Sequence, residues 1–555
     1  MGVSSRVVVT TPIQYIANAY SSAHGHVYAM RTLSEDLSRK LFLKEASLED
    51  SSPSNELGSE ALKKCDGLPL ALVTTAQFLQ SRGDPTRTEW TRLCNNLGEH
   101  LETEDTLARM KSVVCRSYAS LPDHFIKTFL LYLGIFPRDR PVRRERLIRR
   151  WLAEGLFGGD AELATCYFKK LVDRSIIRPI DVSSNTEVKT CQTHGMMLEF
   201  ILHKSRCENF ITLSHDQARQ TGKTRWLSLH PESAGRARMS REDLPFVRSL
   251  TIFGKAHKSV FDFSKYELLR VLDLEECEDE LGDKHLREIC NLLLLRYLSL
   301  GGPISVLPKE IAKLKLLETL DITRTKIEIL PIQVIELPCL IHLFGRCKLE
   351  DASQRISKMK NFLSEKSNLQ TLSGFVADKG FAQLMDHMNN LTKYLKLVAS
   401  HMDKFVIRKG QLNILLRLCI VVQSMEDLEI EEGALPCFES LQLLCKDLDG
   451  LGGIRMEFLG CLKEVALDDG VSDEAKQEWE EAAKKHPRRP KVLFVKTMSE
   501  SEADHQMQTG GMEPAETPAT LAPGHDAQVR LLNEGAEQTV VQVQPTPNPM
   551  LVRGQ

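Results

Sequence analysis

The sequence predicts a multidomain protein of the α and α/β classes, and three observations lead to this prediction. The chain has 555 residues, which is too long for one compact hydrophobic core. A β-branched run near its start predicts a strand of an α/β domain, and mostly helical patterns follow. A leucine signature then repeats through the second half of the chain, which predicts stacked strands rather than another compact domain.

The leucine signature has the spacing L-x-x-L-x-L, and its copies are 22 to 26 residues apart. The central leucines of the clearest copies are Leu227, Leu250, Leu272, Leu298, Leu320 and Leu343. This period and spacing are typical of leucine-rich repeats, whose units stack into a curved solenoid because none buries its apolar face alone. We expect the repeats over 226–497. Weaker strand signals lie near 369–372, 415–418, 441–444 and 462–465.

The composition excludes several classes of function. A net charge of −3 gives no sign of general affinity for nucleic acid or anionic membranes. The 14 cysteines contain no C-x-x-C pair, which predicts reduced thiols in a cytoplasmic or nuclear protein rather than disulfides or a zinc site. No apolar run approaches the roughly 20 residues of a membrane span. We therefore expect no metal, no membrane span and no nucleic-acid partner.

The start of the chain predicts a buried strand. The run Val7–Val9 is followed by the turn Thr10–Pro12, and an apolar β-branched run of this kind is typical of a parallel sheet. Such a sheet needs further strands, and nothing precedes this one. We therefore expect residues 1–31 to be the remnant of an α/β domain whose other strands are missing.

The next regions predict a helical subdomain over 32–108 and a winged helix over 109–205. Ser34 has the position of a helix cap, and it precedes an apolar stripe that contains Leu37, Leu41 and Phe42. In the second region, Leu147, Ile148, Trp151 and Leu152 predict an amphipathic helix. Strands near 175–180 and 187–191 predict a hairpin, a helix is expected from Met196 to His203, and 206–225 is expected to be a linker.

The last segment, 498–555, is rich in Pro, Gly, Glu, Gln, Thr and Ala and has almost no aromatic residues. It cannot bury enough apolar surface to offset the entropy of ordering. We expect a disordered tail.

Four motifs precede the repeats in a fixed order: Ser5–Thr11, Cys65–Ala71 with the letters G-L-P-L-A, Tyr118–Gly155 and Cys191–Phe200. They resemble the sensor strand, the G-L-P-L-A motif, the winged helix and the M-H-D motif of the nucleotide-binding (NB-ARC), leucine-rich-repeat immune receptors of plants. The resemblance covers roughly residues 3–497. It implies that 1–31 is a remnant of the nucleotide-binding α/β domain.

The resemblance also implies a molecular switch, because in intact relatives ADP holds the closed state and ATP releases it. The nucleotide-contacting positions carried over to this chain are Thr11, Pro69 and His194. We expect all three to be vestigial. Pro69 more plausibly breaks a helix and His194 more plausibly starts one.

Departures from the family pattern argue against a working nucleotide site. The sequence contains no G-x-x-x-x-G-K-[ST], and Gly222–Thr224 has Gln217 where the first glycine is required. Pro12 replaces the arginine of the sensor, and Gly195 replaces the aspartate of M-H-D. Phosphate contacts usually dominate nucleotide affinity. We therefore predict little or no binding of ADP or ATP, no other cofactor and no enzymatic activity.

Two surfaces are candidates for partner binding. The variable positions of the repeat strands face the concave side of a solenoid, where mixed charges serve either recognition or solubility. The expected contact residues are Arg270, Asp273, Arg296, Tyr297, Ser299, Glu318, Asp321 and His342. Seven arginines between Arg138 and Arg150 form the second candidate. We expect a solvated face there, with DNA binding as the alternative.

The leading hypothesis is a truncated relative of the plant immune receptors that acts in defence by protein recognition. Its partner would be a pathogen effector, a guarded host protein or a full-length receptor. One alternative is a switch ATPase whose phosphate-binding half is supplied elsewhere, which an in-frame G-K-[ST] loop upstream of Met1 would reveal. The other is a non-functional remnant, which absence of the protein from tissue would favour.

Overall fold

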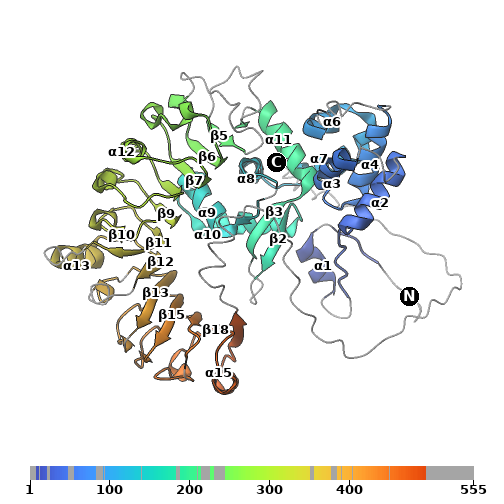
Figure 1. Ribbon diagram of the computed structural model, residues 1–555. Helices are drawn as coiled ribbons and strands as arrows, with labels where there is room; N and C mark the ends of the chain where they lie inside the picture. Colours follow the sequence, from blue (N-terminus) through green and yellow to red (C-terminus); the bar gives the residue numbers. More distant parts are fainter. Residues whose placement is uncertain are drawn as a thin grey trace, which may run out of the picture. The chain divides into compact units, whose positions relative to one another are not determined.

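The computed structural model places most of the chain between residues 8 and 495 (Figure 1). The described residues are 8–11, 13–21, 26–47, 55–82, 92, 94–138, 140–182, 188–208, 210–213, 225–230, 244–350, 356–376, 384–388, 390–402, 404–448 and 450–495. The chain divides into a smaller unit, which contains Met1–Met30, Asp173–Ser175 and Met498–Gln555, and a larger unit, which contains Arg31–Val172 and Ile176–Thr497. The predicted disordered tail lies outside the described residues.

The smaller unit contains one described helix, α1 (Gln14–Ser21). The prediction of a buried strand at its start is wrong for the described part of the run. Val8 and Val9 are 75% and 46% exposed, and neither belongs to a strand. A strand buried on both faces needs neighbouring strands to pair with. The described part of this unit contains no strand with which this run could pair.

The larger unit begins with the predicted helical subdomain. Its helices are α2 (Glu35–Ala46), α3 (Asn55–Cys65), α4 (Pro69–Gln80), α6 (Leu97–Thr103) and α7 (Ala108–Ala119). Ser34 caps α2 as expected, because its hydroxyl accepts a hydrogen bond from the Leu37 amide at 3.4 Å. Phe42 is fully buried, but Leu37 is 53% exposed because α2 buries the face that carries Ser38, Phe42 and Ala46.

The winged helix follows. Its elements are α8 (His124–Tyr132), β1 (Val142–Arg143), α9 (Arg144–Ala153), α10 (Ala161–Asp173), β2 (Ile177–Val182), β3 (Val188–Thr193) and α11 (Gly195–Cys207). The predicted hairpin is confirmed by the antiparallel pairing of β2 with β3, and β1 pairs with the other edge of β3. The turn of this hairpin, 183–187, lies outside the described residues.

The repeats form one sheet in which each strand pairs in parallel with the strand of the next repeat (Figure 1). Its main strands are β4 (Ile211–Leu213), β5 (Trp226–Leu229), β6 (Ser249–Gly254), β7 (Val271–Cys277), β8 (Tyr297–Gly301), β9 (Thr319–Arg324), β11 (His342–Leu349), β12 (Thr371–Val376), β13 (Tyr394–Met402), β15 (Arg417–Met425), β17 (Ser440–Leu444), β18 (Glu464–Asp468) and β19 (Lys491–Val495). The short strand β10 (Ile329–Leu330) pairs with β11, and β14 (Phe405–Ile407) pairs with β16 (Leu428–Ile430).

The register of the sheet explains the leucine signature. Leu227, Leu250, Leu272, Leu298, Leu320 and Leu343 lie directly opposite one another on successive strands. Their side chains are buried in one continuous core along the solenoid. This ladder confirms the predicted repeats, because stacked repeats bury the same position of every strand.

The structure has strands at three places that the sequence signals do not mark, and one of them lies outside the range 226–497 expected for the repeats. Strand β4 lies inside the segment 206–225 that was expected to be a linker, and it pairs with β5. Strands β13 and β19 carry no clear leucine signature, yet both pair in register with their neighbours. The helices α12 (Asp283–Ile289), α13 (Ile356–Glu365) and α15 (Asp473–Lys485) form parts of the return segments. None of the described helices has the length and apolar character needed to cross a bilayer.

Candidate functional site

Helix α9 has two buried faces. Leu147 and Trp151 lie in the core of the winged helix, as predicted. The arginines on the other side are also buried, since Arg146, Arg149 and Arg150 are 5%, 8% and 0% exposed. The expectation of a solvated arginine face is therefore wrong for these three residues, while Arg140 and Arg143 are exposed as expected. The same burial removes these side chains from the alternative role of contacting DNA phosphates.

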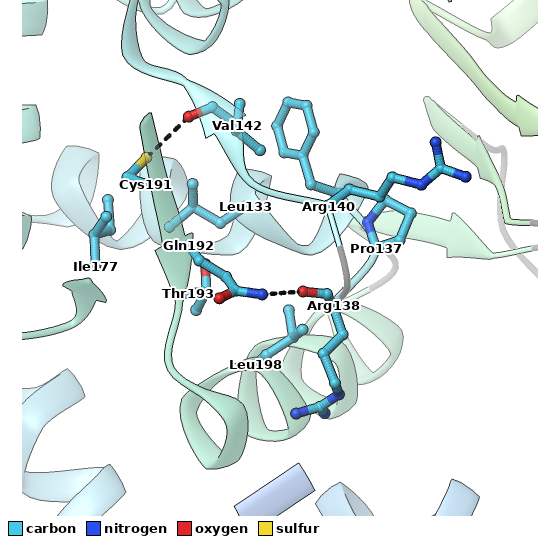
Figure 2. Close-up of a pocket in the computed structure, with 11 residues that line it drawn as sticks. Leu133, Pro137, Arg138, Arg140, Val142, Ile177, Cys191, Gln192, Thr193 and Leu198 are labelled. Atoms are coloured by element: carbon cyan, nitrogen blue, oxygen red, sulfur yellow. Dashed lines mark hydrogen bonds between the residues drawn. The ribbon is translucent and has the colours of Figure 1, made fainter. Parts of the chain in front are cut away.

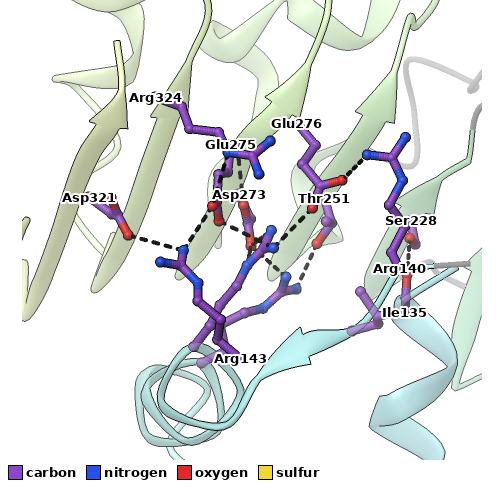
Figure 3. A network of polar contacts seen from close by, with 12 residues as sticks. Ile135, Arg140, Arg143, Ser228, Thr251, Asp273, Glu275, Glu276, Asp321 and Arg324 are labelled. Atoms are coloured by element: carbon purple, nitrogen blue, oxygen red, sulfur yellow. Dashed lines mark hydrogen bonds and ion pairs between the residues drawn. The ribbon is translucent and has the colours of Figure 1, made fainter. Parts of the chain in front are cut away.

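The centre of the site is the contact between α9 and Asp273 on β7 (Figure 3). Arg150 donates from Nη1 to Asp273 Oδ2 at 2.7 Å and from Nη2 to the Thr251 hydroxyl at 2.6 Å. Its Nε donates to the Tyr132 hydroxyl at 3.2 Å. Arg146 donates to the same Asp273 oxygen from Nε at 3.0 Å and from Nη2 at 2.8 Å. One buried carboxylate thus joins two guanidinium groups of the winged helix to the concave side of the sheet.

Further carboxylates surround Asp273. Arg146 Nη1 lies 3.2 Å from Glu275 Oε2 and 3.1 Å from Glu276 Oε1. Arg143 donates to Glu275 Oε1 at 2.8 Å and lies 3.8 Å from Asp321 Oδ2 on β9. Arg146 and Arg150 are spaced i, i+4 on α9 and therefore point toward the same side of the helix. Arg143, whose side chain is 47% exposed, is the residue before the helix and reaches the carboxylates from the end of β1.

Two more arginines lie at the edge of this network. Arg140 pairs with Glu276, and Arg324 Nε lies 3.5 Å from Glu275 Oε1. Their side chains are 43% and 49% exposed, so water screens these pairs more than the central ones. The central contact is therefore the stronger part of the network.

The arginines affect the pKa values of the buried carboxylates. Burial alone would raise the pKa of Asp273, but Arg146 and Arg150 oppose it, and the resulting pKa is lower than usual. Burial raises the pKa of Glu275, and the nearby Asp273 and Asp321 add to this rise while Arg146 and Arg143 oppose it. Asp273 is thus better suited than Glu275 to remain ionised in this contact.

Around Arg149, helix α9 and the sheet complement each other less well than they do around Asp273. The guanidinium of Arg149 lies over the ring of Phe344, with its central carbon 4.4 Å from the ring centroid. Among the described residues, four buried atoms here have no hydrogen-bond partner: Arg149 Nε, Tyr297 Oη, Ser299 Oγ and His342 Nδ1. Burial lowers the pKa of Arg149, although Tyr297 and the more distant carboxylates of Glu145 and Asp321 oppose this shift, and burial lowers the pKa of His342 strongly. A buried charge without a carboxylate partner weakens this part of the contact.

The residues expected to contact a partner lie mostly beneath α9. Asp273 binds its arginines, Tyr297 packs against Ala153, and Arg270 donates to the Glu154 carbonyl at 3.1 Å. Ser299, Asp321 and His342 are buried as well. Arg296 and Glu318 form an ion pair with each other at 3.0 Å. A partner at most of these positions would therefore have to displace a segment of the same chain.

The three positions carried over from the nucleotide-binding motifs belong to two different units. Thr11 belongs to the smaller unit, where its hydroxyl accepts from the Ile13 amide at 3.1 Å. Pro69 is exposed at the first position of α4, and His194 is the residue before α11. Burial lowers the pKa of His194, Asp66 opposes this shift, and Arg178 and Arg138 add to it.

The segments around Pro69 and His194 nevertheless lie together. Arg178 of β2 pairs with Asp66 at 3.0 Å, and Lys64 of α3 pairs with Glu199 of α11 at 2.9 Å. Arg138 also pairs with Glu199. These contacts join the helical subdomain to the winged helix through charged side chains that come from both sides.

A small pocket lies within the winged helix (Figure 2). Leu133, Val142, Ile177 and Leu198 supply apolar parts of its wall, and Gln192 supplies polar atoms. Its volume of about 20 Å³ suits a water molecule or two and is far below the 300 Å³ or more of a typical ligand site. In the described part of the chain, no three side chains of the metal-binding types cluster around a common point.

Sequence reasoning missed the pairing of α9 with the repeats. The available signal was charge complementarity, because arginines with the spacing i, i+3 and i+7 precede an acid-rich strand that contains Asp273, Glu275 and Glu276. Both patterns are also common on solvated surfaces. Only the fold shows that segments more than 120 residues apart in the sequence meet.

Comparisons with known proteins agree with this architecture. A family model described as "Leucine-rich repeat region" matches residues 246–404. Another, described as "Disease resistance protein Winged helix domain", matches residues 135–201. Both matches lie within the regions predicted for these folds.

Relatives in rice (Oryza sativa subsp. japonica) match nearly the whole chain. Two proteins named "Disease resistance protein RGA4" are each 42% identical to it, and each match covers 97% of this chain. The matches cover 64% and 66% of these relatives, so the chain spans about two thirds of their length. The rice "Disease resistance protein Pik-2" is 36% identical over 64% of this chain and 36% of its own length.

Proposed function

Since the chain belongs to the leucine-rich-repeat disease-resistance proteins of plants, we propose that it acts in the defence response by recognising a protein partner through its repeats. Its resting state is the closed arrangement in which α9 covers part of the concave face. The partner is a pathogen effector, a guarded host protein or an intact relative, and it is met in the cytoplasm or the nucleus.

The observation that carries this proposal is the burial of Arg146 and Arg150 against Asp273. Removing one member of a buried ion pair typically costs about 3–5 kcal/mol, because the remaining charge has no partner. Separating the two surfaces as a whole is different, because water then solvates all three charges. A contact of this kind tolerates the loss of a side chain poorly but can open as a unit, which suits a two-state switch.

The proposed recognition surface continues along the concave face beyond α9. The positions that correspond in register to His342 on later strands are Thr371, Tyr394, Arg417, Ser440, Glu464 and Lys491. Arg417 and Lys491 are exposed, and Tyr394 and Glu464 are partly buried. A partner could contact this row first and then compete with α9 for the neighbouring strands.

Co-precipitation from leaf tissue with an intact rice relative tests the proposal. The wild-type chain should be captured, and a chain with Arg417→Glu and Lys491→Glu should not be. The Asp283→Asn variant is the matched control, because Asp283 is an exposed acid at the start of α12, in a return segment. Failure to capture intact relatives or defence-linked proteins, together with an unchanged leaf response on overexpression, would contradict the proposal.

A nucleotide-dependent switch is the second candidate. It is favoured by one observation, namely that the segments around Pro69 and His194 are joined by the Asp66–Arg178 pair. The absence of G-x-x-x-x-G-K-[ST] from the sequence opposes it. We expect isothermal titration of the purified chain with ADP and Mg²⁺ to give no measurable heat of binding. Micromolar affinity would establish the switch instead.

A further inference from the structure

The carboxylates beneath α9 form a surface that we call the acidic face, made of Asp273, Glu275, Glu276 and Asp321. We infer that the acidic face is a docking site for arginine-bearing helices and that α9 is its resident occupant. The external partner it fits is a helix with arginines at the α9 positions of Arg146 and Arg150, an arginine just before the helix at the position of Arg143, and an acidic residue at the position of Arg149. The inference rests on the proposed function, because it takes the repeats to be where partners act.

Only a few side chains of α9 pair with the acidic face, and another helix could have the same side chains. Arg146 and Arg150 on α9, together with Arg143 just before it, reach the carboxylates, with donor–acceptor distances of 2.7 to 3.2 Å for the pairs of Arg146 and Arg150. The apolar residues Leu147 and Trp151 face the winged helix instead. Recognition by the acidic face therefore depends on one stripe of cationic side chains, and forked guanidinium donors match carboxylates well.

The acidic face does not fit α9 equally well along its length. The sheet places Tyr297 and His342 on either side of Thr319, and it places Ser299 and Phe344 on either side of Asp321. Arg149 lies over Phe344, and both Arg149 and Lys393 disfavour the protonated form of His342.

The groups in this corner need a different neighbour. The hydroxyl groups of Tyr297 and Ser299 are buried without an acceptor, and unsatisfied buried groups of this kind destabilise a contact. A carboxylate at the Arg149 position would replace a guanidinium that burial disfavours and could accept from these hydroxyls. It would also attract Lys393. An external helix with this one difference should therefore bind more tightly than α9 does.

The experiment uses the full chain with Arg146→Gln and Arg150→Gln, which weakens the hold of α9 and leaves the acidic face intact. Three fluorescent synthetic peptides that span residues 140–155 are the probes. One has the native sequence, one carries Arg149→Glu, and one carries Arg146→Glu with Arg150→Glu. The last peptide keeps the apolar residues, so it controls for binding through them.

We expect fluorescence anisotropy to show binding of the native peptide, at least tenfold tighter binding of the Arg149→Glu peptide, and at least 100-fold weaker binding of the charge-reversed peptide. Adding Asp273→Asn and Asp321→Asn to the chain should abolish binding of the first two. A second measurement needs no substitution in the protein. Excess Arg149→Glu peptide should accelerate hydrogen exchange in α9 of the native chain, and the charge-reversed peptide should not.

Three outcomes would overturn the inference. The first is equal binding of the native and charge-reversed peptides, and the second is binding of the Arg149→Glu peptide no tighter than that of the native one. The third is self-association of the chain through the acidic face in preference to peptide, which would assign the site to a second copy. Peptide binding without partner capture in leaves would contradict only the proposed function, whereas capture without peptide selectivity would contradict only this inference.

Discussion

Gly195 and Lys64 lie so close that a β-carbon at position 195 would be 2.3 Å from the Lys64 carbonyl oxygen. Gly195 is the first residue of α11 and Lys64 is near the end of α3, so this approach joins the winged helix to the helical subdomain. The family resemblance predicts an aspartate at position 195. The structure has no room for that side chain, and the departure from the family pattern therefore has a packing consequence.

Restoring the family residue should destabilise this chain. The Gly195→Asp variant has to move the end of α3 away, and overpacking of this kind typically costs about 1–3 kcal/mol. Thermal and urea unfolding of the purified protein measure the change. Gly460→Ala is the matched control, because a β-carbon there would meet nothing within 4 Å. Equal stability of Gly195→Asp and the wild type would show that the two helices are not so tightly apposed.

The Arg150→Gln variant should lose more stability than any substitution of an exposed arginine. It leaves Asp273 with one guanidinium and removes the bonds to Thr251 and Tyr132, so we expect a loss of about 3–5 kcal/mol. Urea unfolding checks this value. Arg296→Gln breaks a partly exposed pair with Glu318 and should cost at most about 1 kcal/mol. Similar losses for both variants would contradict the central role of Arg150.

Arg149→Leu should stabilise the closed chain or leave it unchanged, although the residue is buried. The guanidinium has no carboxylate partner among the described residues and lies beside His342. Leucine keeps an apolar contact with Phe344 and removes a charge that burial disfavours. We expect a gain of up to about 1 kcal/mol, since the lost contact with the ring offsets part of the benefit. A loss above that size in urea unfolding would show that Arg149 holds the contact together.

Stability should fall as the pH drops below about 6.5, the usual pKa of histidine. The folded pKa of His342 is lowered strongly by burial and further by Arg149 and Lys393. Between that folded pKa and 6.5, the unfolded chain binds more protons than the folded chain, so protons favour unfolding. Each such group contributes up to about 1.4 kcal/mol per pH unit.

The His342→Gln variant should therefore show a shallower fall in its urea midpoint between pH 7 and pH 5 than the wild type. The slope should not vanish, because burial also lowers the pKa of His194. The His124→Gln variant, an exposed position at the start of α8, should keep the wild-type slope. Identical slopes for His342→Gln and the wild type would contradict the burial of a neutral imidazole at this position.

The parts of the fold that depend on local pattern were predictable from the sequence. Leu272 and Leu298 indicate their strands, because every repeat packs against its neighbours and must bury the same positions. The cap at Ser34 is equally local. The candidate site was not predictable, because the contact of Arg150 with Asp273 joins residues 123 positions apart. The sequence alone does not show whether a charged side chain is solvated or buried against an opposite charge.

Strand β13 was missed for a related reason. Its sequence has Leu395 and Leu397, and Leu395 follows Leu372 by 23 residues, but Thr392 stands where the L-x-x-L-x-L spacing requires the first leucine. In the structure, its register with β12 and β15 assigns it to the sheet. The error at Val8 and Val9 is the opposite one, because a strand was predicted where the structure has none. β-Branched residues favour strands only where other strands are present to pair with them.

The contact of α9 with the sheet also affects the cooperativity of unfolding. A solenoid held only by contacts between adjacent repeats can fray one unit at a time. Here Arg150 reaches Thr251 on β6 and Asp273 on β7, and Arg143 reaches toward Asp321 on β9, so one helix ties non-adjacent strands together. Strands β6 to β9 should therefore melt as a single block with the winged helix, while the strands near β19 open and close on their own.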